Sequence, residues 1–180
     1  MRLTLRVNAA AVEAEIQPGE TLLRLLRRHG FWSVKYGCDT GDCGACTVLA
    51  DGVPVLACLY PAVRAATQEL TTVEALGHTD ALHPLQRAFL EHGAAQCGYC
   101  TPAMLLVAHA LLQREPSPDA EAIRAALAGV LCRCTGYLKP VEAIQACAGP
   151  RGTAATRSVT PAARTIAARD ESGEGHEHTA

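Results

Sequence analysis

Eight of the nine cysteines in this 180-residue chain fall into two groups of regular spacing. The two groups are Cys38, Cys43, Cys46 and Cys58, followed by Cys97, Cys100, Cys132 and Cys134. Three kinds of chemistry compete for so many thiols: disulfide bonds, zinc binding and iron–sulfur cluster binding. Disulfides need an oxidising compartment, and the alternating start Met1–Val7 has no apolar core of an export signal. We therefore favour metal binding.

The first group runs C-x4-C-x2-C over residues 38–46, which is the spacing of plant-type [2Fe–2S] ligands. Asp51-Gly52 lies between two apolar runs and predicts a hairpin. Such a hairpin returns the chain to Cys46 and so brings Cys58 beside it. A loop wrapped around a cluster also needs residues that can adopt positive φ angles and let the backbone come close to the cluster. The loop has glycines at Gly37, Gly41 and Gly44.

The second group consists of C-x2-C, ending at Cys100, and C-x-C, ending at Cys134. The first pair directly precedes a predicted helix, whose amino-terminal N–H groups and dipole favour thiolates. On spacing alone, this set fits structural zinc as well as an iron–sulfur cluster.

Hydrophobic periodicity divides the chain into two structural classes. Alternation predicts strands at residues 2–8, 12–16, 47–50, 53–57 and 70–73. Thr21 is the expected N-cap of a helix over Leu22–His29, which Gly30 ends. Helical periodicity then predicts helices over Pro84–His92, from Thr101 to the break at 115–118, from a cap at Ser117 to Leu127, and from Pro140 onward.

We therefore predict an α+β chain of two domains. Residues 1–76 are expected to form a β-grasp, plant-type ferredoxin domain, and 77–84 a linker. Residues 85–148 are expected to form an all-α four-helix bundle, whose metal the spacing alone leaves open. Residues 149–180, rich in small and charged side chains, are expected to be a disordered or partner-bound tail.

The formal net charge of −2 indicates neither nucleic acid nor an anionic membrane as partner. No apolar run approaches the length of a membrane span. We expect a cytoplasmic protein.

Three sequence blocks resemble the small iron–sulfur subunit of the xanthine dehydrogenase family of molybdenum hydroxylases. The blocks are Gly37-Cys38 with Gly41-Asp42-Cys43-Gly44-Ala45-Cys46-Thr47-Val48, His83-Pro84-Leu85-Gln86 with Gln96-Cys97-Gly98-Tyr99-Cys100-Thr101-Pro102, and Leu131-Cys132-Arg133-Cys134-Thr135-Gly136-Tyr137. The resemblance covers about residues 1–147. One position departs from it: family members usually carry Asn where this chain has Val130.

The resemblance implies two [2Fe–2S] clusters, each held by one of the two groups of four cysteines. It implies a large partner subunit with the molybdenum–pterin cofactor and a medium partner subunit with FAD. Electrons would pass from molybdenum to the helical-domain cluster, then to the plant-type cluster, then to FAD. Gln96 would hydrogen-bond the pterin, and the Cys134 side of the helical cluster would face it. The substrate, the final acceptor and the oligomeric state of the complex stay open.

Two other functions remain open from the sequence: a free-standing two-cluster electron carrier and a zinc- and iron-binding scaffold. Cys147, left over from the two groups, is expected to be a buried small hydrophobe. We expect His83 to be a turn residue and His109 an ordinary helix residue. Arg133 could offset cluster charge or contact a partner. The four tyrosines lie within three residues of a proposed ligand and either shield the clusters or fill the core.

Overall fold

The first two strands form because every second side chain is buried. Strand β1 (Arg2–Val7) buries Leu5 and Val7 and pairs antiparallel with β2 (Ala10–Glu15). Asn8 and Ala9 form the turn, with φ values of 54° and 64°. This left-handed pair matches the twist of the flanking strands, as in the tight hairpin turns that Asn favours.

The computed structural model describes residues 1–149 and contains one mixed five-stranded sheet. Its strands lie in the order β2, β1, β5 (Glu69–Thr71), β3 (Thr47–Ala50) and β4 (Val53–Leu56). Strands β1 and β5 are parallel, and the other neighbours are antiparallel. Helix α1 (Leu22–Arg28) packs against this unit through four buried leucines, and Thr21 caps it as predicted.

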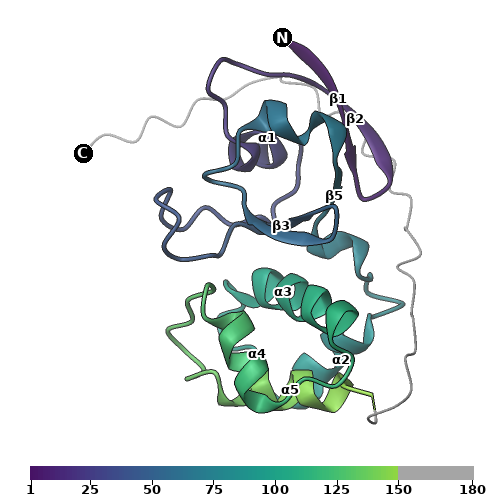
Figure 1. The fold of residues 1–180 in the computed structure, drawn as a ribbon, viewed down its shortest axis with the longest axis vertical. Coiled ribbons are helices and arrows are strands. Elements are labelled where there is room, and N and C mark those ends of the chain that lie inside the picture. The colour runs from purple at the N-terminus through teal and green to yellow at the C-terminus, as the bar shows by residue number, and fades with distance from the viewer. Residues whose placement is uncertain (150–180) are drawn as a thin grey trace.

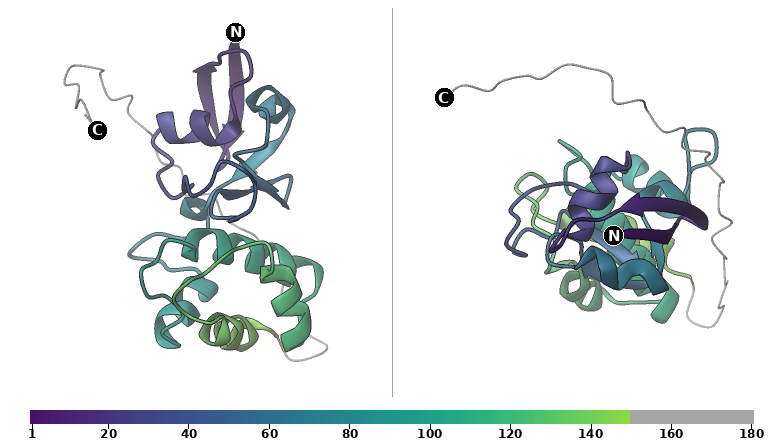
Figure 2. Two further views of the ribbon diagram at one scale, coloured as in Figure 1. Left: turned by 90° about the vertical axis from the view of Figure 1, so that its left-hand side faces the viewer. Right: turned by 90° about the horizontal axis from the view of Figure 1, so that it is seen from above.

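Four helices form a second unit below the sheet in Figure 1, and the turned view agrees (Figure 2). They are α2 (Pro84–Glu91), α3 (Thr101–Arg114), α4 (Ala120–Leu127) and α5 (Leu138–Cys147). Helix α3 is buried on most sides because it packs between the strands β3 and β4 and the helices α2 and α4. Leu49 of β3 belongs to the helical core, so the two units share packing.

The mixed α+β architecture is confirmed, but several predicted boundaries are wrong. Asp119, not Ser117, caps α4, because its carboxylate accepts the N–H of Ala122 at 2.8 Å. The Ser117 hydroxyl instead donates to the carbonyl of Gly149. Helix α5 starts at Leu138, two residues before Pro140. Proline fits there because N–H groups of a first helical turn have no intrahelical acceptor.

Two short 3-10 helices were missed, at Ala62–Thr67 and Val73–Ala75. The second replaces the end of the predicted last strand, which runs from Glu69 only to Thr71. Short 3-10 segments carry little periodicity, so the sequence pattern could not separate them from loop or strand.

The predicted tail lies outside the described residues except for Gly149. Its N–H donates to the carbonyl of Pro116, so the described chain ends beside the α3–α4 connection. Among residues 1–149, every helix is too short or too polar to cross a membrane.

Candidate metal centres

The first cysteine group lies in one loop and the hairpin that follows it. Cys46 stands directly before β3, and Cys58 follows the returning strand β4. The register pairs Thr47 with Leu56, and the N–H of Ala57 approaches the carbonyl of Cys46 at 3.4 Å. The predicted hairpin therefore brings the fourth cysteine to the loop.

The loop around this group leaves no space for side chains at its glycines. A Cβ on Gly37 would lie 2.7 Å from the Cys43 sulfur. The N–H of Cys43 in turn points at the Cys38 sulfur at 3.4 Å. Backbone N–H groups directed at sulfur stabilise thiolates, which is the environment that a cluster needs.

The thiols of the first group differ in their acidity. Backbone N–H groups of Cys43 and Thr40 lower the pKa of Cys38 to about 6. Burial raises the pKa of Cys46 to about 12. Cys46 and Cys58 are 2% and 4% exposed, so iron bound there would be shielded from water. Metal binding has to displace protons from such buried thiols.

The second group is assembled from two loops of the helical unit. Cys97 and Cys100 precede α3, and Cys132 and Cys134 lie between α4 and α5. The sulfurs of Cys134 and Cys97 are 3.6 Å apart. These two residues are exposed, whereas Cys100 is buried.

Local hydrogen bonds hold the loop of Cys132. Its N–H donates to the Tyr137 hydroxyl at 2.8 Å, and that hydroxyl donates to the carbonyl of Val130. Burial alone would raise the pKa of Cys132, but hydrogen bonds from the hydroxyl and backbone of Thr135 bring it to about 7. Burial raises the pKa of Cys100 to about 12.

No three His, Cys, Asp or Glu side chains of residues 1–149 converge on a point where a single metal ion could sit. A [2Fe–2S] cluster instead spreads four thiolates over two irons. Two sets of four unpaired thiols, with N–H groups and a hydroxyl directed at the sulfurs, fit that larger group.

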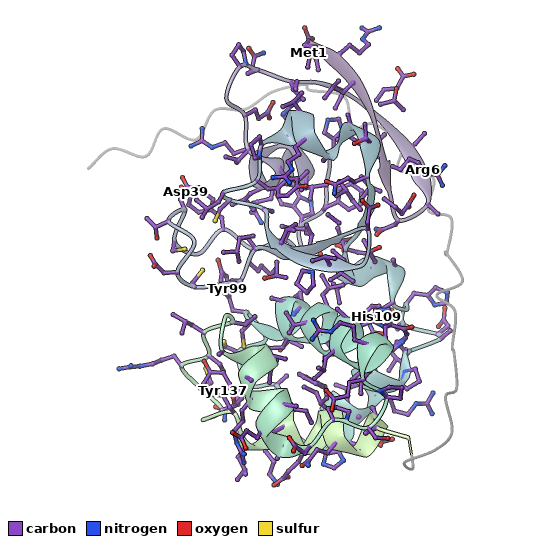
Figure 3. The ribbon with its side chains drawn as sticks, in the orientation of Figure 1. Met1, Arg6, Asp39, Tyr99, His109 and Tyr137 are labelled. Carbon is purple, nitrogen blue, oxygen red and sulfur yellow. The ribbon has the colours of Figure 1, made fainter. Side chains whose placement is uncertain are left out.

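The two cysteine groups come from adjoining loops. The N–H of Leu131, next to Cys132, donates to the carbonyl of Cys43 at 2.9 Å. Tyr99, between the cysteines of the second group, donates its hydroxyl to the carbonyl of Tyr36 at 2.5 Å. Asp39, Tyr99 and Tyr137 lie along one side of the molecule, whereas His109 lies toward the other (Figure 3).

The tyrosines divide between the two roles that the sequence left open. Tyr36 and Tyr99 are 49% and 45% exposed and border the cysteine loops. Tyr60 packs against the core of the sheet unit, and Tyr137 both packs on the helical core and holds a cysteine loop. The bonding roles of Tyr99, Tyr137 and Thr135 were not predicted; proximity to a cysteine was their only sequence signal.

The remaining candidate residues have simple environments. Gln96 and Arg133 lie beside the second group, Gln96 exposed and Arg133 outside either core. Val130 is buried in the helical core, which explains an apolar residue at this position. Cys147 packs against the same core but is only partly buried, whereas we expected it to be buried.

His83 and His109 have structural roles, and His83 does more than form the predicted turn. Its ring Nδ1 accepts the N–H of Leu85 at 3.2 Å, and its backbone N–H donates to the Oε1 of Gln86 at 2.8 Å. These bonds form a capping box at the start of α2. His109 is buried in α3, with its ring edge-on to His83 at 5.3 Å between centroids.

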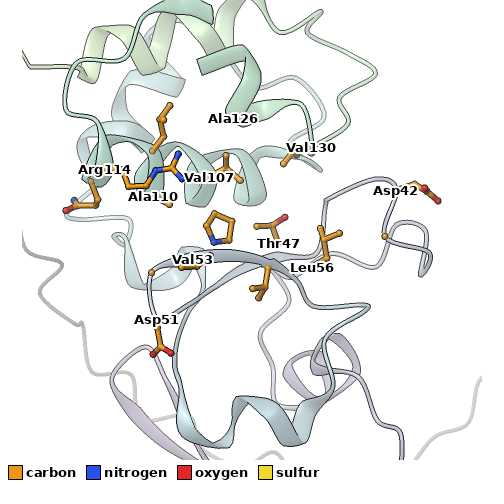
Figure 4. A pocket seen from close by; sticks show the side chains of 17 residues that line it. Asp42, Thr47, Asp51, Val53, Leu56, Val107, Ala110, Arg114, Ala126 and Val130 are labelled. Carbon is orange, nitrogen blue, oxygen red and sulfur yellow. The ribbon is translucent and has the colours of Figure 1, made fainter. Parts of the chain in front are cut away.

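A groove of about 730 Å³ separates the β3–β4 hairpin from α3 (Figure 4). Its walls are mainly apolar, with Val53 and Leu56 on one side and Val107 on the other. None of its lining residues is a cysteine, although Gly41 and Asp42 of the first loop reach its end.

Comparison with known proteins identifies both units. Residues 5–76 match the family described as "2Fe-2S iron-sulfur cluster binding domain", and residues 72–145 match "[2Fe-2S] binding domain". The chain is 42% identical over 143 residues to the xanthine dehydrogenase iron-sulfur-binding subunit of Escherichia coli O157:H7, covering 78% of this chain and 90% of that protein. The chain belongs to the small iron–sulfur subunit family of xanthine dehydrogenase-type molybdenum hydroxylases.

Other members of this family agree. The nicotinate dehydrogenase small FeS subunit of Eubacterium barkeri is 45% identical over 144 residues, which cover 79% of this chain and 92% of that protein. A chain of quinoline 2-oxidoreductase from Pseudomonas putida 86 has a TM-score of 0.78 at 39% identity, with 81% of this chain and 90% of that chain covered. This iron–sulfur subunit therefore carries two [2Fe–2S] clusters and serves electron transfer in an oxidoreductase.

Proposed function

We propose that this subunit relays electrons one at a time from a molybdenum–pterin centre through its two clusters to FAD or another acceptor. The cofactors at the two ends would lie on a large and a medium partner subunit. The observation that carries the proposal is the adjoining position of the two cysteine groups, whose loops are hydrogen-bonded between Leu131 and Cys43. A [2Fe–2S] cluster accepts one electron, so two in series connect a two-electron oxidation to a distant acceptor.

The proposed ligands of the plant-type cluster are Cys38, Cys43, Cys46 and Cys58. Those of the helical cluster are Cys97, Cys100, Cys132 and Cys134. The grouping rests on the β3–β4 hairpin for the first set and on the contact between Cys97 and Cys134 for the second. The chain's contribution is to direct N–H groups and the Thr135 hydroxyl at the sulfurs, which tunes the potentials.

The helical cluster is the one that we propose faces the molybdenum–pterin centre. Cys134 and Gln96 are both exposed, so both are accessible to a partner subunit. An amide beside the exposed thiols suits the donor and acceptor groups of a pterin ring. The buried cysteines of the first group would then serve the outer relay toward FAD.

The domain boundaries that we propose remain 1–76, 77–84, 85–148 and 149–180. We classify the first domain as a β-grasp and the second as a four-helix bundle, since α2 packs on α5 and α3 on α4. A cytoplasmic location is proposed because metal-binding thiols persist where the compartment is reducing.

Metal and acid-labile sulfide analysis tests the assignment. Two [2Fe–2S] clusters require four iron atoms and four sulfides per chain. Zinc together with half that iron would overturn the second site. Purification from the native host tests the partners: co-elution with a molybdenum-containing subunit supports the proposal, whereas elution alone with both clusters indicates a free-standing carrier.

A further inference from the structure

Tyr99 connects the two cysteine groups through its side chain. It lies between Cys97 and Cys100, yet its hydroxyl donates to the carbonyl of Tyr36, two residues before Cys38. Its ring also lies against the first loop, because the ring carbon Cε1 would be 3.7 Å from a Cβ on Gly37. A residue of the helical unit therefore packs on the loop of the other unit.

The ring has a cation beside it as well. The ammonium of Lys35 lies 6.0 Å from the ring centroid, at the outer limit of a cation–π contact. Lys35 belongs to the sheet unit, where its backbone N–H approaches the carbonyl of Ala45. The phenol is thus held at its hydroxyl end and on its ring by the sheet unit.

A second contact with the first cysteine loop comes from the other cysteine loop of the helical unit, between α4 and α5: the N–H of Leu131 donates to the carbonyl of Cys43. This bond joins a residue next to one proposed ligand with another proposed ligand. Its persistence depends on the two loops staying together. Tyr99 is 45% exposed, so its position is not explained by filling a core.

We propose that Tyr99 is a positioning residue for electron passage between the clusters. Its hydroxyl and ring hold the loop before Cys38 against the helical unit and so keep the Leu131–Cys43 contact closed. This inference rests on the proposed electron relay. It adds the side chain that holds the two cysteine groups, and so the two clusters, next to each other. Tyr99 itself is neither oxidised nor reduced.

The test compares Tyr99→Phe with the native sequence in the full, cluster-loaded chain. The phenylalanine keeps the ring and removes the hydrogen bond. Loss of one neutral hydrogen bond changes an equilibrium about fivefold, so hydrogen exchange of the segment around Leu131 is expected to accelerate about fivefold. The magnetic coupling between the two reduced clusters, seen by EPR, is expected to weaken, and electron transfer between them after rapid reduction is expected to slow.

Tyr60→Phe is the matched control, because its hydroxyl bonds to Gln68 within the sheet unit. It is expected to change neither exchange at Leu131 nor the coupling. A second variant, Lys35→Met, is expected to accelerate the same exchange in the same direction without altering either set of ligands.

The outcomes separate this inference from the proposed relay. The relay itself would be refuted if the native chain lacked two distinct EPR signals or held fewer than four iron atoms. Intact clusters together with unchanged exchange and coupling in Tyr99→Phe would refute the role of Tyr99 alone. Should Tyr99→Phe lose iron, the Lys35→Met result decides: accelerated exchange supports the inference, and native exchange overturns it.

Discussion

Gly44 lies directly against the carbonyl oxygen of Gly129, so that a Cβ on Gly44 would be 1.8 Å from that oxygen. Gly44 also has a φ of 68°, in the left-handed region that favours glycine. The two backbones meet between the first cysteine loop and the end of α4. No side chain can be inserted there without separating the units.

Gly44→Ala is therefore expected to be strongly destabilising. The left-handed backbone contributes about 1 kcal/mol, and the clash with backbone raises the total to about 3 kcal/mol or more. Denaturant unfolding of the loaded chain measures the change in the free energy of unfolding. Gly52→Ala is the matched control: its φ is 78° but the surrounding space is open, so a loss of only about 1 kcal/mol is expected. Equal losses in both variants would contradict the tight contact.

Cys43→Ser is expected to abolish the plant-type cluster and leave the helical one. Serine is a poor ligand for iron in this setting, because the soft thiolate is lost. Iron content should halve and one of two EPR signals should disappear. Reduction of the remaining cluster by substrate should persist in an assembled complex. Cys147→Ser is the control and should retain full iron, since it lies outside both groups; loss of iron in that variant would count against the ligand assignment.

Gln86→Ala is expected to lower the free energy of unfolding by about 1 kcal/mol, since the N–H of His83 loses its acceptor. Gln86→Glu keeps an oxygen at the same distance along the side chain and should stay near the native value. Thermal unfolding of the two variants makes the comparison. If alanine and glutamate behave alike, the capping box contributes no stability.

Acid is expected to weaken the helical core through His109. Burial holds the pKa of His109 below its ordinary value of 6.5. The unfolded chain therefore binds the proton first as pH falls, and the free energy of unfolding drops below about pH 6.5 by at most about 1.4 kcal/mol per pH unit. Above that pH the histidine is neutral in both states and the full stability is present.

The measurement compares the pH dependence of unfolding in the native chain and in His109→Gln. The variant should have a shallower slope below about pH 6.5. Part of the slope should remain, because burial also lowers the pKa of His29. Identical slopes would show that folding leaves the pKa of His109 unchanged.

The sequence predicted the strands and helices whose patterns are local. The period-two alternation before Asn8 and the Thr21 cap each depend on a few neighbouring residues. The start of α4 was misplaced because Ser117 and Asp119 are both good caps, and the tertiary bond from Ser117 to Gly149 decides between them.

The cysteine groups were predictable from spacing, whereas the contacts between them were not. Hydrogen bonds such as Leu131 to Cys43 use backbone atoms, which every residue has, and therefore leave no mark in the sequence. The role of Tyr99 depends on a partner 63 positions away. A glycine such as Gly44 indicates that space is short but not which segment occupies it.

The unequal exposure of the cysteines has a consequence for how the protein loses its clusters. Cys46 and Cys58 are almost fully covered, whereas Cys38 and Cys43 of the same group are partly exposed, so reagents can reach the plant-type site only from its Cys38 side. Cys97 and Cys134 are open to the surface, although Cys100 of the same group is buried, so the helical site has one exposed side even in the folded chain. A chelator or oxidant is therefore expected to remove the helical cluster of the holoprotein before the plant-type one.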